Sequence, residues 1–228
     1  MFAVLPRALM PITFANPVDS TPTWLKDGNP LANFPWSSDA KTKLIENVDT
    51  VVIGAGMTGA SLAYHWRRRA APEQMLALLE MNDPATGASG RNGGSIVMGR
   101  YFAMVHKRLL EHWKSTGQHN SDEMRDRLAK KFAGVYCAGA YRNADMIEEA
   151  VRTHHLDCDY SRNGWIQLRA PSEQRALDGS VQMAEQSGYT DWARISPPDI
   201  ERLSGIRVAN DAGFSQKAAQ YHPAKWVW

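Results

Sequence analysis

The chain has 228 residues, of which 43% are hydrophobic and 22% are charged, and its formal net charge is +2 at pH 7. These values are ordinary for globular proteins, so they exclude a disordered or fibrous chain. The small net charge is not the excess of basic residues expected of a protein that binds nucleic acid or an anionic membrane. Two cysteines are too few for a small secreted domain that is stabilised by several disulfides.

The N-terminal segment lacks the pattern of a signal peptide. Pro6 and Pro11 interrupt the apolar stretch over residues 1–15, and Arg7 lies inside this stretch rather than ahead of it. No apolar run approaches the roughly 18 residues of a transmembrane helix. We therefore expect a cytoplasmic protein without a membrane partner. Residues 1–48 are expected to form an extended arm, because residues 16–38 are rich in Pro, Asn, Ser and Asp.

Periodic patterns begin after this arm. The short β-branched run at 50–53 predicts a buried strand, helical spacing follows over 57–69, and a second apolar strand is predicted at 75–79. Four glycines within residues 87–94 predict a loop. Further along, the patterns predict helices at 101–113, 121–153 (with Ser121 as N-cap), 172–187 and 199–203, and a strand at 165–168.

The first glycine motif is Gly54-Ala55-Gly56-Met57-Thr58-Gly59, which matches GxGxxG. The motif alone is a weak signal, but here it follows a predicted strand and opens a predicted helix. The three glycines would allow a tight turn, close approach of a pyrophosphate and close helix–strand packing. Glu80 ends the second strand about 20 residues further on, where an acid can accept hydrogen bonds from ribose hydroxyls. The sequence therefore predicts a dinucleotide site, and both NAD and FAD fit it.

A second glycine cluster, Thr86-Gly87-Ala88-Ser89-Gly90-Arg91-Asn92-Gly93-Gly94, separates these two cofactors. Together with the first motif and Glu80, it makes residues 49–96 resemble the N-terminal segment of the D-amino-acid-oxidase-like FAD-dependent oxidoreductases, in particular the glutamylputrescine-oxidase-like branch. Weaker similarity continues through residues 157–159, 164–168 and 221–225.

The resemblance implies an α/β fold, with an incomplete doubly wound FAD/NAD(P)-binding (Rossmann-like) unit and a mixed α+β substrate-domain segment. It implies that residues 49–120 form the FAD-binding βαβ unit with its glycine-rich loop. Residues 121–228 would form a helical insertion and the start of the substrate domain. The resemblance also places FAD against both glycine clusters: Gly54, Ala55, Gly56, Met57, Thr58 and Gly59 at the pyrophosphate, Glu80 at the ribose, and Ser89, Gly90, Arg91, Asn92, Gly93 and Gly94 toward the isoalloxazine.

The same resemblance implies oxidation of a C–N bond in a small amine or amino acid, with dioxygen as the electron acceptor. It assigns no catalytic residue and no oligomeric state. Because the family's remaining parallel strands return after the substrate domain, we expect the 228 residues to represent a C-terminally truncated flavoprotein. Two alternatives stay open: a non-catalytic fragment of the FAD fold, and an NAD-dependent dehydrogenase.

Three other features of the sequence are given structural interpretations. His154, His155 and Cys158 have no second Cys/His pair, so we expect no metal site. The basic residues 67–69 are expected at the solvent-exposed C-terminal end of the first predicted helix, where positive charges complement the helix dipole. Core packing is the default role for Trp165 and Trp192, although either could line a substrate pocket.

Overall fold

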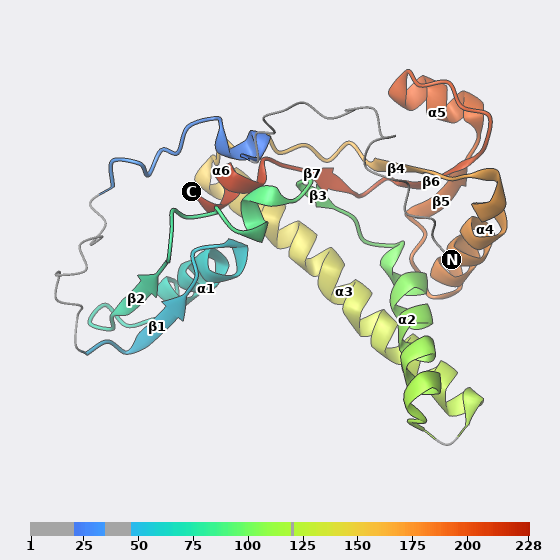
Figure 1. Ribbon diagram of the computed structural model, residues 1–228, viewed down its shortest axis with the longest axis horizontal. Coiled ribbons are helices and arrows are strands. Elements are labelled where there is room, and N and C mark those ends of the chain that lie inside the picture. Colours follow the sequence, from blue (N-terminus) through green and yellow to red (C-terminus); the bar gives the residue numbers. More distant parts are fainter. Residues whose placement is uncertain (1–20, 35–46, 120) are drawn as a thin grey trace, which may run out of the picture. The chain divides into compact units, whose positions relative to one another are not determined.

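The computed structural model describes residues 21–34, 47–119 and 121–228 (Figure 1). They divide into two compact units: Asn92–Val227 form the second, and the preceding residues form the first together with Trp228. Most of the expected N-terminal arm, and the segment considered as a signal peptide, lie outside the described residues. Within the arm, Thr23–Leu25 form one turn of 3₁₀-helix, η2.

The first unit is built on a βαβ arrangement. Strand β1 (Thr50–Ile53) pairs in parallel with β2 (Leu76–Leu79), and helix α1 (Met57–Arg67) connects them (Figure 1). This arrangement confirms the predicted α/β class. Helix α1 ends at Arg67 rather than at the predicted Arg69, because the N–H of Arg69 bonds to the carbonyl of Trp66 and closes a terminal turn.

The sequence predicted a loop for the glycine-rich segment 87–94, but part of this segment is regular in the structure. Residues Ala88–Arg91 form a 3₁₀-helix, η3. It is held by the N–H of Gly90, which donates to the carbonyl of Ala85 at 2.8 Å. Composition alone signals a break in periodicity and does not show this short helix or the backbone bond that ties it to Ala85.

Two packed helices form one part of the second unit. Helices α2 (Tyr101–Thr116) and α3 (Asp122–His154) lie side by side (Figure 1) and share a core of Phe102, Ala133 and Cys137. Both helices belong to the second unit, and the expected boundary at residue 120 stays a prediction. Helix α3 begins as predicted, since the Ser121 hydroxyl accepts a hydrogen bond from the N–H of Met124 at 3.1 Å.

A three-stranded antiparallel sheet forms another part of the second unit. Its strand order is β4 (Trp165–Leu168), β6 (Ala212–Ser215) and β5 (Trp192–Ile195), and helix α4 (Gln174–Gln186) packs against it. Only β4 had been predicted. The remaining elements are β3 (Ser95–Ile96), which pairs with β7 (Ala219–Gln220), a 3₁₀-helix η4 (Pro171–Glu173), and helices α5 (Pro197–Ser204) and α6 (Pro223–Val227).

The tryptophans of this sheet belong to the core. Trp192 is 1% exposed and packs with Leu177 and Ala184 of α4, while Trp165 lies partly buried beside it with ring centroids 6.4 Å apart. A Cβ on Gly213 would lie 2.0 Å from the Trp192 ring. Strand β6 therefore carries a glycine at the position where the Trp192 ring lies against it.

Candidate functional site

The GxGxxG motif forms the turn between β1 and α1. Gly54 has a φ of +97°, a conformation that side chains disfavour, and its N–H donates to the carbonyl of Leu79 at 2.7 Å. Gly56 is the N-cap residue of α1 and supplies no side-chain cap. Ala55 lies between them in the turn, and Met57 and Thr58 begin the helix. The motif therefore points the start of a helix toward the end of a parallel sheet.

Gly59 brings this helix close to the strand. A Cβ at this position would lie 1.9 Å from the carbonyl oxygen of Gly54 and 3.3 Å from the side chain of Val52. No larger residue fits without moving the backbone. The predicted packing role of the third glycine is therefore visible in the structure.

The carboxylate of Glu80 lies at the same turn. Its Oε2 accepts a hydrogen bond from the N–H of Ala55 at 2.6 Å, and its Oε1 accepts one from the N–H of Asn82 at 3.0 Å. The bonds from Asn82 and Ala55 lower the pKa of Glu80 below its ordinary value. An ionised carboxylate has about four lone-pair sites, so acceptor capacity is left for ligand hydroxyls.

Ser89 connects the second glycine cluster to the first. Its hydroxyl accepts a hydrogen bond from the N–H of Met57 at 2.8 Å, so it caps the first turn of α1 from a distant part of the chain. A Cβ on Gly56 would lie 2.7 Å from this hydroxyl oxygen. Sequence reasoning had singled out Ser89 for a cofactor contact, but it could not detect this capping role, because no local spacing signals it.

The rest of the cluster divides between the two units. Gly90 and Arg91 lie in η3 of the first unit, where Arg91 Nε donates to the carbonyl of Thr86 at 2.9 Å. Asn92, Gly93 and Gly94 belong to the second unit. There Asn92 Oδ1 accepts from the N–H of Gly94, whose carbonyl accepts from the N–H of Tyr221. The structure thus brings together Gly54–Gly59, Glu80 and Ser89–Arg91 of the predicted set.

This arrangement suits a dinucleotide. The start of a helix favours phosphate groups through its N–H groups and its dipole, and an anionic carboxylate favours hydroxyl donors. Both are present at one turn of the first unit. The described residues also contain no group of three His, Cys, Asp or Glu side chains arranged to hold a metal ion.

A model of the FAD-dependent oxidoreductase family matches residues 49–228. The chain belongs to this family. FAD is the family's cofactor, which agrees with the prediction made from the second glycine cluster.

A relative that matches the chain is distant in sequence. The chain is 21% identical to the gamma-glutamylputrescine oxidoreductase of Escherichia coli (strain K12) over 175 residues, which is 77% of this chain and 36% of that relative. The chain therefore spans about a third of the length of this relative.

Two solved structures share the fold of this chain. The L-amino acid deaminase from Proteus vulgaris matches 84% of this chain and 39% of its own, with 16% identity and a TM-score of 0.54. The iminodiacetate oxidase from Chelativorans sp. BNC1 matches 78% of this chain and 42% of its own, with 17% identity and a TM-score of 0.50. Within the described parts of this chain, no helix is both long and apolar enough to cross a membrane.

Proposed function

We propose that this protein is an FAD-dependent oxidoreductase that oxidises a C–N single bond of a small amine or amino acid, with dioxygen as the electron acceptor. When bound, FAD supplies the redox chemistry by taking a hydride from the carbon next to the amine nitrogen. The family match over residues 49–228 supports this assignment, and the names of the relatives point to amines and amino acids as substrates.

The chain's own residues would bind and orient the cofactor. The backbone at Gly54, Gly56 and Gly59 would hold the pyrophosphate against the start of α1, with Ala55, Met57 and Thr58 as parts of the same turn. Glu80 would accept hydrogen bonds from the adenosine ribose. Ser89, Gly90, Arg91, Asn92, Gly93 and Gly94 would line the path toward the isoalloxazine.

One observation carries the proposal: the anionic Glu80 and the hydroxyl of Ser89 both bond to backbone N–H groups of the glycine turn, at 2.6 and 2.8 Å. The glycine turn, Glu80 and the part of the second glycine cluster that lies in the first unit therefore form a single site. An NAD-dependent dehydrogenase would share the first two features, but the family match favours FAD.

The test is titration of the purified chain with FAD and, separately, with NAD, followed by absorption and flavin fluorescence. An amine-dependent hydrogen peroxide assay on the loaded protein then tests the reaction. FAD uptake with peroxide formation is the expected result. FAD uptake without peroxide would favour a non-catalytic fragment, and stoichiometric NAD binding without FAD binding would favour the dehydrogenase.

The Glu80→Ala substitution tests the ribose contact. Loss of a charged hydrogen-bond acceptor typically costs 1.5–3 kcal/mol, so the Kd for FAD should rise by about tenfold or more. The exposed Glu73 lies in the same unit outside the site, and Glu73→Ala is the matched control. If Glu80→Ala folds normally and binds FAD as tightly as the control does, the assigned role of Glu80 is wrong.

A further inference from the structure

A turn of the N-terminal arm lies against the second glycine cluster within the first unit. The one-turn helix η2 (Thr23–Leu25) packs on η3 (Ala88–Arg91), although the two are far apart in the chain. Leu25 is half-buried, and a Cβ on Gly90 would lie 3.0 Å from its Cδ2 atom. Gly90 itself is buried. An apolar side chain of the arm therefore covers the backbone of η3.

The backbone of η3 is joined to the first glycine motif. The N–H of Gly90 donates to the carbonyl of Ala85 at 2.8 Å, and the N–H of Ala85 donates to the carbonyl of Ala55 at 3.1 Å. The hydroxyl of Ser89, in the same short helix, accepts from the N–H of Met57 at 2.8 Å. Two routes therefore connect η3 with the glycine turn, and both depend on where η3 lies.

Ala85 has a backbone conformation that its surroundings must support. Its φ is +68°, in the left-handed region that residues with a Cβ rarely adopt, and the residue is 2% exposed. Such a conformation persists only where neighbouring contacts hold it. The carbonyl of Ala85 is bonded to Gly90, against which Leu25 packs. If the contact of Leu25 with Gly90 is removed, we expect the segment 85–90 to populate other conformations.

We propose that Leu25 is a positioning residue for FAD, because η2 acts as a strap that holds η3, the Ser89 hydroxyl and the glycine turn in the arrangement that receives the pyrophosphate. This inference rests on the proposed function, since it takes FAD as the ligand. The effect passes through η3 and requires no contact between Leu25 and the cofactor. A loop that is already ordered binds more tightly, because the apparent Kd rises as the binding-competent fraction of the protein falls.

The test is Leu25→Ala, which shortens the side chain that covers Gly90. In the chain without FAD, amide hydrogen exchange at Gly90 should become about three- to tenfold faster, while the β1–β2 ladder keeps its protection. Titration with FAD, followed by flavin fluorescence, should give a Kd about three- to tenfold above that of the wild type. Leu25→Met keeps an apolar side chain of similar volume and should restore both values.

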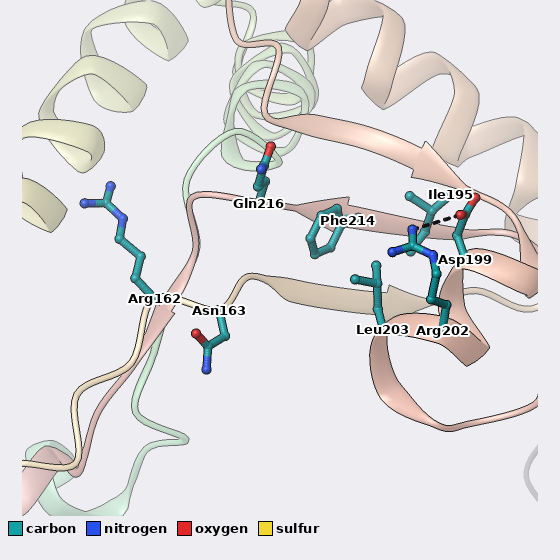
Figure 2. A pocket seen from close by; sticks show the side chains of 8 residues that line it. All are labelled: Arg162, Asn163, Ile195, Asp199, Arg202, Leu203, Phe214 and Gln216. Atoms are coloured by element: carbon teal, nitrogen blue, oxygen red, sulfur yellow. Dashed lines mark hydrogen bonds and ion pairs between the residues drawn. The ribbon is translucent and has the colours of Figure 1, made fainter.

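Leu203→Ala is the matched control, because it makes the same change in the second unit. Figure 2 shows Leu203 of α5 and Phe214 of β6 among the residues that line a cavity of about 630 Å³. The residues that line this cavity all belong to the second unit, whereas the glycine turn and η3 belong to the first. Leu203→Ala should therefore leave the exchange of Gly90 and the Kd for FAD unchanged.

The two measurements separate the ways in which the inference can fail. Unchanged exchange at Gly90 in Leu25→Ala would overturn it, because η2 would then not hold η3. Faster exchange with an unchanged Kd would overturn it as well, since the order of η3 would not matter to FAD. An equal loss of protection at Gly90 and along the β1–β2 ladder would show that Leu25 stabilises the whole unit rather than this loop.

Failure of the proposed function gives a different result. A wild type that binds no FAD would contradict the proposed function, and the inference about Leu25 would fail with it. If the wild type binds FAD and Leu25→Ala binds it equally tightly, the inference alone is wrong.

Discussion

At the scale of single residues, the glycine turn depends on contacts that permit almost no additional volume. Gly59 faces the carbonyl oxygen of Gly54, and an added methyl group would overlap it at 1.9 Å. The residue therefore matters for packing whether or not a nucleotide is bound. This separates its role from that of Glu80, whose carboxylate remains ionised and accepts hydrogen bonds.

Gly59→Ala should therefore destabilise the first unit by about 1–3 kcal/mol, as overpacking of a close contact typically does. Gly87→Ala is the control, since a Cβ there has no neighbour within 4 Å and the change should stay within about 0.5 kcal/mol. Amide hydrogen exchange of the β1–β2 ladder measures both effects. Equal protection of this ladder in the two variants would show that helix α1 can shift at no cost.

At the scale of elements, helix α3 is the longest in the described chain, and its start is defined by one side chain. Ser121 accepts the hydrogen bond from Met124, and Asp122 and Glu123 complement the helix dipole in the first turn. The helix is also joined to α2 by His106, whose Nε2 lies 2.8 Å from Asp126 Oδ1. The first turns of α3 are therefore held both by a cap and by a neighbouring helix.

Ser121→Ala should cost about 1 kcal/mol of unfolding free energy, because it removes the acceptor for an N–H at the start of α3. Ser121→Asp retains an acceptor and should recover most of this loss. Urea denaturation followed by circular dichroism at 222 nm measures the difference. If Ser121→Ala and the wild type unfold at the same urea concentration, the packing against α2 rather than the cap determines where the helix begins.

At the scale of the whole molecule, the parallel sheet of the first unit leaves apolar side chains in contact with solvent. Val51 and Ile53, on one face of β1, are 53% and 86% exposed, whereas Val52 on the other face is 5% exposed. Parallel sheets are ordinarily covered on both faces. The two faces of this strand should therefore respond differently to the same substitution.

Ile53→Thr should change the unfolding free energy by less than about 0.5 kcal/mol and reduce the binding of a hydrophobic dye such as ANS. Val52→Thr should cost about 1–3 kcal/mol, because it places a hydroxyl in the packed contact with α1. Thermal unfolding and ANS fluorescence of the two variants provide the comparison. A large loss of stability in Ile53→Thr would show that this face is covered in solution.

The sequence by itself determined the features that depend on neighbouring residues in the chain. The order of β1, α1 and β2, the positive φ of Gly54 and the cap at Ser121 all follow from local backbone chemistry. The predicted family was confirmed for the same reason, since its motifs are local. The cofactor contacts of the individual residues stay predictions.

Only the tertiary structure decided the features that join distant segments. Strands β5 and β6 were not predicted. In β6, Gly213 lies where the ring of Trp192 leaves no room for a Cβ, and this reason for a glycine inside a strand is visible only in the folded chain. The cap that Ser89 supplies to α1 spans more than 30 positions, and the cavity beside Phe214 combines residues from separate loops and elements. Such contacts depend on how strands and helices pack, which residue spacing does not encode.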